Sequence, residues 1–372
     1  MKTDSIGIYV HVPFCLRKCN YCDFCSYPNV NAELRAKYIS NLIDEIRSYS
    51  NRSISVDTIF FGGGTPTLLS ENEFENITNE IYKTFRVDGA VEFSVEANPK
   101  TVDQNRLSFM KSLGVNRLSI GMQSIHANEL KKLGRIHTHK DFLVAFSNAR
   151  ETGFNNINVD IMYGIPDQTP ASFEQTINAI TSLAPEHISM YSLILEENTP
   201  LFIDSEAYKF PSEDDEIEMY RLAQGVLSSF GYEHYEISNY ALSGCRCRHN
   251  MKYWQGKEYL GFGVAAHSFY NGVRFGNISD ISGYCCDVEN RTSKEDNEQS
   301  DRAFEYIMLH LRLSDGFSLS EFTKEFGFEP KFVYSEKFKR LVENKLIRFD
   351  GDKISLSDEG FYVSNSIISD FL

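Results

Sequence analysis

The sequence predicts an α/β fold, a partial (β/α)6 barrel of parallel strands followed by a small winged-helix-like α+β domain. Residues 6–195 alternate short β-branched runs with longer amphipathic stretches, the pattern of parallel strands joined by crossover helices. Six strand-like runs in this order favour an open barrel over a complete eightfold one. The segment from residue 302 onward changes to a helix-rich pattern that includes a hairpin.

The strand candidates of the barrel are short β-branched runs. In chain order they are Ile6–His11, Thr58–Phe61, Glu92–Glu96, Arg117–Met122, Asn156–Ile161 and His187–Leu193. The windows between them are amphipathic and bounded by turn residues or helix caps, which predicts helices. These helices lie near Glu33–Ser50, Glu71–Phe85, Asp103–Leu113, His139–Thr152 and Pro170–Leu183.

Polar residues recur where the predicted strands end. Gly62-Gly63-Gly64-Thr65, Glu96, Gln123 and Asp160 each lie at or just after the C-terminal end of a strand. Parallel α/β folds place their active sites at that edge, so we expect these residues to converge on one mouth.

The chain after the barrel predicts two further units. Residues 1–200 form the barrel, and 201–296 are expected to be an elaboration packed on it, with a helix near Glu213–Phe230. A polar linker is expected over Glu289–Asp301. Residues 297–372 then form the C-terminal domain. Its expected elements are helices near Arg302–Leu313, Ser318–Phe326 and Lys331–Asn344, a hairpin around Asp350-Gly351, and a terminal helix.

Composition excludes several classes of protein. The 372 residues contain 52 acidic and 37 basic side chains, and the net charge of -15 repels nucleic-acid backbones. The predicted wing is itself acidic, so we expect no DNA binding. No apolar window approaches the roughly 18 residues of a membrane span, and no signal segment follows Met1. We therefore expect a cytoplasmic protein without an integral membrane segment.

Four of the eight cysteines lie between Cys15 and Cys25, which favours a metal site in a reducing compartment over disulfides. Cys15, Cys19 and Cys22 directly follow the first strand. Three thiolates at such short spacing can each reach a different iron of a [4Fe–4S] cluster and leave one iron open. A zinc site with Cys25 as fourth ligand, or a group of buried free thiols, is the alternative.

This cysteine spacing resembles the signature of the radical S-adenosylmethionine superfamily. The surrounding motifs resemble the oxygen-independent coproporphyrinogen III oxidase group, and most closely its heme-chaperone branch. The motifs that carry the resemblance are Ile8-Tyr9-Val10-His11-Val12-Pro13-Phe14-Cys15, Phe61-Gly62-Gly63-Gly64-Thr65-Pro66-Thr67, Glu96-Ala97-Asn98-Pro99, Gly121-Met122-Gln123-Ser124, Gly134-Arg135 and Asp160-Ile161-Met162-Tyr163-Gly164-Ile165-Pro166.

The resemblance implies that the open iron binds S-adenosylmethionine, which the reduced cluster cleaves to a 5′-deoxyadenosyl radical. Glycines let the backbone approach a ligand, a carboxylate accepts hydrogen bonds from an ammonium or ribose, and arginine pairs with an acid group. Each of these residues alone could equally be structural. The resemblance assigns the cofactor to Tyr9, Tyr21, Gly63, Gly64, Thr65, Glu96, Gln123, Arg135 and Asp160. Whether one or two cofactor molecules bind stays open.

Two differences from the oxidases of this group argue against coproporphyrinogen decarboxylation by this chain. Those enzymes carry a longer N-terminal segment over the substrate cavity, whereas five residues precede the first strand here. They also place a fourth cysteine where this chain has Phe24, with Cys25 one position later.

A second constellation, Cys245 to Trp254, lies outside the barrel strands. Imidazole and thiolate are axial ligands of heme iron, and flat aromatic rings suit a porphyrin. A helix cap and a core-filling tryptophan are the alternative. His-Asn-x-x-Tyr-Trp resembles a motif of the heme-chaperone branch, and this resemblance favours heme binding without fixing the axial ligand. The candidates are His249, Cys247, Asn250, Tyr253 and Trp254, with Arg246 and Arg248 for the propionates.

Three functions follow as hypotheses. The first is a chaperone that binds the cluster, S-adenosylmethionine and heme and passes heme to a client protein, for example a cytochrome. The second is coproporphyrinogen III decarboxylation by hydrogen abstraction. The third is a zinc-stabilised interaction protein. The sequence does not identify the client, the electron donor, the oligomeric state, cofactor cleavage in turnover, or the roles of Cys25, Cys285 and Cys286.

Overall fold

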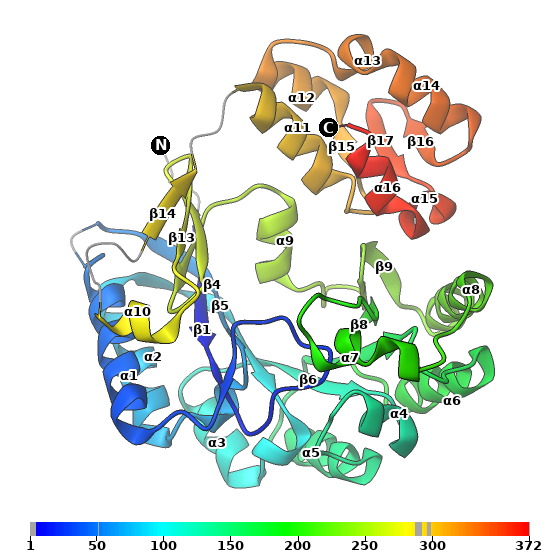
Figure 1. The fold of residues 1–372 in the computed structure, drawn as a ribbon. Helices are drawn as coiled ribbons and strands as arrows, with labels where there is room; N and C mark the ends of the chain where they lie inside the picture. Colours follow the sequence, from blue (N-terminus) through cyan, green and yellow to red (C-terminus); the bar gives the residue numbers. More distant parts are fainter. Residues whose placement is uncertain (1–4, 51, 287–291, 296–298, 372) are drawn as a thin grey trace.

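The central sheet of the computed structural model confirms the partial barrel. The model describes residues 5–50, 52–286, 292–295 and 299–371. All six predicted strands are present, adjacent in chain order and mutually parallel (Figure 1). They are β1 (Ile6–Val12), β4 (Ser55–Gly63), β5 (Arg86–Ala97), β6 (Arg117–Gln123), β7 (Ile157–Tyr163) and β8 (His187–Ser192).

The segment expected as an elaboration extends this sheet at both edges. Beside β1 lies a seventh parallel strand, β11 (Tyr259–Phe262), which is followed by the antiparallel strands β12 (His267–Tyr270), β13 (Val273–Asn277) and β14 (Thr292–Glu295). Beside β8 lie β10 (Asn239–Ala241) and β9 (Glu233–Glu236). Within the described residues the sheet has 12 strands and stays open.

The predicted linker over Glu289–Asp301 is wrong at two places. Thr292–Glu295 forms β14 and pairs with β13, and helix α11 (Gln299–His310) already begins inside the range. A polar strand at a sheet edge needs no apolar periodicity, so the pattern carried no strand signal. Residues 289–291 and 296–298 of this prediction lie outside the described residues.

The crossover helices cover the outer face of the barrel (Figure 1). The five predicted ones are α1 (Ala32–Arg47), α2 (Glu71–Thr84), α3 (Gln104–Ser112), α5 (His139–Glu151) and α6 (Pro170–Thr181). Local chemistry fixes their starts: Ser70 with Glu73, and Thr138 with Asp141, form capping boxes. The sequence missed α4 (Ala127–Lys132), which is too short for a periodic pattern. The predicted helix after the barrel is α8 (Glu213–Ser229).

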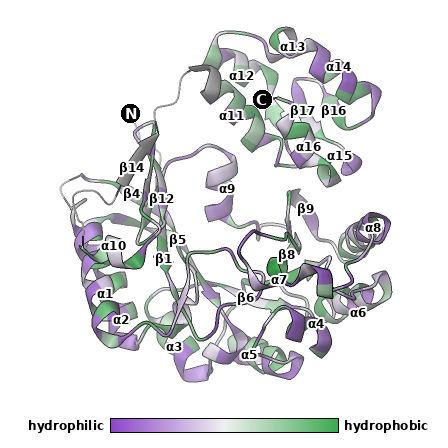
Figure 2. Cartoon of the chain, in the orientation of Figure 1, coloured by the Kyte–Doolittle hydropathy of each residue, from purple (hydrophilic) through white to green (hydrophobic). Residues whose placement is uncertain are grey.

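Each barrel strand has two different faces. The outward residues are buried apolar side chains that pack under the helices, for example Ile59 and Phe61 on β4 and Val95 on β5. In Figure 2 hydrophilic residues gather on outer helices such as α1 and α14. The inward residues alternate with the apolar ones and many of them are polar, so the barrel interior is a cavity lined by polar and aromatic side chains rather than a packed apolar core.

The C-terminal domain contains the predicted helices and hairpin. After α11 follow β15 (Phe317–Ser318), α12 (Leu319–Phe326), α13 (Pro330–Val333), α14 (Ser335–Glu343), β16 (Ile347–Asp350), β17 (Lys353–Leu356), α15 (Asp358–Tyr362) and α16 (Ser364–Ser369). The single helix expected over Lys331–Asn344 is broken at Tyr334, and the terminal helix is also two short ones. No helix in the described ranges has the length and apolarity to cross a membrane.

One short helix lies between the barrel and the C-terminal domain. This helix, α9 (Arg248–Trp254), contacts β4 on one side and α11 on the other (Figure 1). Arg312 stacks over the Trp254 ring at 5.4 Å, and Arg246 pairs with Asp315 at 2.8 Å. The second constellation of the sequence therefore forms the interface between the two domains.

Candidate cluster and cofactor site

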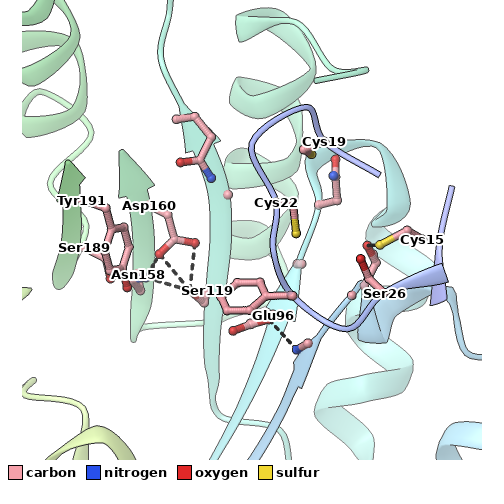
Figure 3. Close-up of a pocket in the computed structure, with 18 of the residues that line it drawn as sticks. Cys15, Cys19, Cys22, Ser26, Glu96, Ser119, Asn158, Asp160, Ser189 and Tyr191 are labelled. Carbon is pink, nitrogen blue, oxygen red and sulfur yellow. Dashed lines mark hydrogen bonds between the residues drawn. The ribbon is translucent and has the colours of Figure 1, made fainter. Parts of the chain in front are cut away.

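A cavity of about 460 Å³ opens at the C-terminal ends of the barrel strands. All three predicted cluster cysteines and all nine predicted cofactor residues line it, and Figure 3 shows Cys15, Cys19 and Cys22 beside the strand ends that carry Glu96 and Asp160. These residues come from seven different segments of the chain. The structure therefore brings together the residues that strand-end reasoning and the motif resemblance had selected.

The cysteine loop runs between β1 and α1 and is anchored by its backbone. Its two ends pair as the short strands β2 (Phe14–Cys15) and β3 (Tyr27–Pro28), and the Asn20 N–H donates to Leu133 O at 3.0 Å. Cys15 Sγ lies 3.8 Å from Thr65 Oγ1, and Cys19 Sγ lies 3.6 Å from Arg135 Nη1. All three thiols are partly exposed to the cavity. Their sulfur atoms are accessible, and the contacts of Cys15 and Cys19 are long, so these thiols can bind iron without breaking a strong hydrogen bond.

Burial raises the pKa of the Cys15 and Cys22 thiols. Both are therefore protonated in the free protein at neutral pH, and binding iron would release their protons. The Arg135 guanidinium, whose own pKa is raised, lies beside Cys19, with Nη1 3.6 Å from the sulfur.

The contacts of Cys25 distinguish it from the three cysteines that line the cavity. Among the described residues no three histidine, cysteine or acidic side chains converge as ligands of a single metal ion. A [4Fe–4S] cluster does not need such convergence, because each cysteine binds a different iron. Cys25 Sγ donates to Ser279 O at 3.1 Å and does not line this cavity. The loop fits a cluster, and the zinc alternative with Cys25 as fourth ligand is not supported.

Two buried carboxylates, Glu96 and Asp160, line the cavity. Burial and the neighbouring Asp160 raise the pKa of Glu96 to about 8, although the Gly63 N–H donates to it at 3.1 Å. Burial also raises the pKa of Asp160, which accepts hydrogen bonds from Ser119 Oγ and Asn158 Nδ2 (Figure 3). A cationic ligand in the cavity would stabilise both ionised forms.

Close packing requires glycine in the turn that follows β4. At Gly63, with φ 107°, a Cβ would lie 2.5 Å from the His11 ring, and at Gly64 it would lie 2.7 Å from Phe14 O. The turn thus approaches the start of the cysteine loop so closely that only glycine fits. Its glycines serve the fold as well as any ligand.

Gln123 and Arg135 close the other side of the cavity. Gln123 ends β6 at a register shift with φ 68°, a left-handed conformation that is uncommon for residues other than glycine. Such positions occur at binding sites when the surrounding structure imposes them. Arg135 Nη2 donates to Gly121 O at 2.6 Å, which orients the guanidinium toward Cys19.

Several cavity residues were missed by the sequence analysis. Ser119, Asn158, Ser189 and Tyr191 lie on the inner faces of β6, β7 and β8 (Figure 3), and Arg117 lies deeper. On β6, Ser119 lies two residues after Arg117. On β7, Asn158 lies two residues before Asp160, and on β8, Ser189 lies two residues before Tyr191. A search for polar residues at period two within the predicted strands would have found them.

The heme candidates of α9 form the floor of the barrel. His249 is 1% exposed, its Nδ1 bonds Thr58 Oγ1 at 2.9 Å, and its Nε2 bonds Tyr253 Oη at 2.8 Å. Burial lowers the pKa of His249 to about 3 and raises that of Cys247 to about 12. Both ring nitrogens of His249 are hydrogen-bonded, so an iron bound at this residue would have to replace the Thr58 or the Tyr253 hydroxyl as a partner.

The other residues of this constellation are similarly engaged. Glu92 accepts hydrogen bonds from the backbone N–H groups of Arg248 and His249, both at 3.0 Å. The Arg248 guanidinium pairs with Asp57, and Arg246 pairs with Glu233 and Asp315. The arginines expected for heme propionates therefore already have acidic partners. Asn250 and Tyr253 still line the main cavity, whereas Cys247 and Trp254 do not.

A partial (β/α)6 barrel with three loop thiols beside a cavity lined by polar and aromatic side chains defines a radical S-adenosylmethionine protein, and residues 9–180 match the radical SAM superfamily. Residues 298–363 match the HemN C-terminal domain. The chain belongs to the HemW family of this superfamily. It is 34% identical to the heme chaperone HemW of Bacillus subtilis over 98% of both chains, and 30% identical to that of Escherichia coli over 100% of this chain and 99% of the relative.

Among solved structures, coproporphyrinogen III oxidase HemN from Escherichia coli shares this fold. Its TM-score is 0.87 at 21% sequence identity, covering 99% of this chain and 90% of the oxidase. The similarity includes the C-terminal domain, so the whole architecture is common to the two proteins.

Proposed function

We propose that this protein is a heme chaperone that binds a [4Fe–4S] cluster, S-adenosylmethionine and heme, and transfers heme to a client protein. The observation that carries the proposal is the match over nearly the entire chain to relatives named as heme chaperones. The convergence of the three cysteines and the cofactor residues on one cavity supports it.

Cys15, Cys19 and Cys22 would hold three irons of the cluster, and the fourth iron would bind the methionine part of the cofactor and supply redox chemistry there. Glu96 would accept hydrogen bonds from the cofactor's ammonium or ribose. Gln123, Arg135 and Asp160 would hold its other polar groups, and Tyr9 and Tyr21 would line the pocket.

The second candidate function is oxidation of coproporphyrinogen III, which the shared fold favours. Phe24 argues against it, because this exposed side chain stands where the oxidases carry a fourth cysteine and its ring is 68% exposed. We place the chaperone first and propose no turnover chemistry for the cluster.

We further propose that the protein works in the reducing cytoplasm, where its thiols stay free for iron. Its client would be a heme protein such as a respiratory cytochrome. An electron donor would keep the cluster reduced.

The test uses the protein after anaerobic reconstitution. We expect about four irons and four sulfides per chain, stoichiometric heme binding, and transfer of heme to an apo-cytochrome. Anaerobic incubation with coproporphyrinogen III should give no decarboxylated product. Clear decarboxylation would overturn the chaperone assignment, and stoichiometric zinc without iron would overturn both cluster-based functions.

A further inference from the structure

Three arginines line the main cavity, and their guanidinium groups differ in what they contact. Arg17 is exposed on the cysteine loop at the mouth, and Arg135 donates to Gly121 O. Arg117 is only 2% exposed, yet its guanidinium forms no hydrogen bond or ion pair with another residue that the structure describes. Its Nε is buried without a partner. The cavity therefore contains one buried cation whose N–H donors the described part of the chain does not use.

The position of Arg117 in the sheet separates it from the cluster loop. Arg117 begins β6, where it lies opposite Ser94 of β5, and Gln123 ends the same strand at the mouth. A strand of this length spans roughly 20 Å. A cofactor carboxylate bound to the open iron at the mouth would therefore lie far from the first residue of β6. Arg117 lines the deep end of the cavity, above the floor that α9 forms with His249 and Asn250.

The carboxylates near Arg117 are already engaged by other donors. Both oxygens of Glu92 accept hydrogen bonds from the first backbone N–H groups of α9. Asp160 accepts hydrogen bonds from side chains of β6 and β7, and Glu96 accepts one from the turn after β4. Burial raises the pKa of both Asp160 and Glu96, which reduces their negative charge. These neighbours do not supply the hydrogen bonds that the guanidinium lacks.

The other groups beside Arg117 are uncharged. The Tyr235 hydroxyl accepts a hydrogen bond from the Cys247 N–H at 3.2 Å. Burial raises the pKa of Cys247 to about 12 and lowers that of His249 to about 3, so this thiol and this imidazole stay neutral. An anion that reaches Arg117 therefore meets Glu92 as its main source of repulsion.

The chemistry of the guanidinium indicates what kind of group would satisfy it. An arginine stays protonated in a protein, and a buried charge without hydrogen bonds is costly. Its planar fork binds a carboxylate through two parallel N–H···O bonds, which satisfy the donors and the charge together. Heme carries propionates and S-adenosylmethionine carries a carboxylate, so both ligands of the proposed function offer this group.

We propose that Arg117 binds a carboxylate of a ligand that occupies the deep end of the cavity. The ligand is a heme, through a propionate, or a molecule of S-adenosylmethionine other than the one on the open iron. The inference rests on the proposed function for the identity of these ligands. It assigns a binding role to a residue that neither the strand-end pattern nor the motif resemblance selected.

The test compares heme with heme dimethyl ester, in which both propionates are esterified, in the anaerobically reconstituted protein. The native protein should bind the ester at least about tenfold more weakly than heme, because the ester offers no charged acceptor to Arg117. Arg117→Met removes the donors at similar volume and should bind heme and the ester with equal affinity. The comparison of the two ligands in the native protein does not depend on the folding of this variant.

Arg106→Met is the matched control. Arg106 on α3 also has a buried Nε and Nη2 without partners, but it stacks on Phe74 and Phe109 and does not line the cavity. This variant should distinguish heme from its ester as the native protein does. In parallel, equilibrium dialysis counts the S-adenosylmethionine molecules bound per chain in each protein.

The outcomes separate the inference from the function on which it rests. If the native protein binds no heme, the proposed function fails, and the cofactor count alone decides the role of Arg117. A lower count in Arg117→Met assigns the carboxylate to S-adenosylmethionine. If the native protein binds heme and the ester equally and the count is unchanged in the variant, the inference alone is overturned. Equal weakening of heme and ester in Arg117→Met, with an unchanged count, would show that Arg117 only stabilises the fold and would also overturn it.

Discussion

Cysteines lie at both the mouth and the floor of the barrel, but they differ in their exposure and in their hydrogen bonds. At the mouth, Cys15, Cys19 and Cys22 are partly exposed and make only long contacts. At the floor, Cys247 is fully buried with a pKa raised to about 12, and both nitrogens of His249 are hydrogen-bonded. The two cysteine-containing regions therefore differ in how strongly the protein's own side chains already engage their reactive groups.

The cause of this difference is the packing of α9. Parallel strands leave their C-terminal ends open to ligands, whereas here their N-terminal ends are closed by α9, which the C-terminal domain covers from outside. Glu92 caps the first N–H groups of α9, so the helix is held by a buried carboxylate on the barrel side. The floor is built for stability and the mouth for binding.

The largest expected effect concerns the mouth. Cys19→Ser should abolish assembly of the [4Fe–4S] cluster, since two thiolates cannot hold it, and the measurement is iron and sulfide content with the absorption spectrum after anaerobic reconstitution. Cys25→Ser is the matched control and should retain the cluster, because its thiol faces Ser279. A full cluster in the Cys19 variant, or its loss in the Cys25 variant, would contradict the ligand assignment.

The next effect concerns the floor. Glu92→Ala removes the acceptor at the start of α9 and one of the acidic neighbours of the buried Arg117, so we expect a loss of about 3 kcal/mol in the free energy of unfolding. Urea unfolding followed by the fluorescence of Trp254, the only tryptophan, measures it. Glu75→Ala, on the exposed face of α2, should change stability little. A loss below about 1 kcal/mol for Glu92→Ala would show that α9 is held by other contacts.

The third prediction is a pH dependence at the mouth. Glu96, with a pKa of about 8, is about one-tenth ionised at pH 7. A cationic cofactor group that pairs with the carboxylate should therefore bind about tenfold more weakly at pH 6 than at pH 7, a range in which an α-ammonium group stays protonated, as equilibrium dialysis with S-adenosylmethionine would measure. Glu96→Gln should remove this dependence. Affinity that falls as pH rises would contradict the assignment.

The same pKa affects the stability of the cofactor-free protein with the opposite sign. The folded pKa of Glu96 lies above the ordinary value of 4.5, so its contribution is fully present below pH 4.5 and is lost as pH rises through about 8. Binding and stability should thus change in opposite directions over this window. Glu96→Gln should flatten both curves.

The fold was largely predictable from the sequence, because β-branched runs and capped helices carry local signals. The polar edge strand β14 and the six-residue helix α4 gave no such signal. Of the candidate site, strand ends located Glu96 and Asp160, but the inward-facing Ser119 was missed because only the ends were considered. The hydrogen bonding of the His249 ring could not be predicted, since its partner Thr58 is 191 residues away in the sequence.

The smallest expected effect separates the floor from the cavity at one side chain. Tyr253 belongs to both, because its hydroxyl bonds His249 and the residue also lines the main cavity. Tyr253→Phe should therefore cost about 1 kcal/mol of unfolding free energy, the value of one neutral hydrogen bond, and leave heme affinity and spectrum unchanged. Urea unfolding and heme titration on the same sample measure the two. If heme binding instead falls with the hydroxyl, the oxygen itself contacts the ligand, and the division between a stabilising floor and a binding mouth does not hold at this residue.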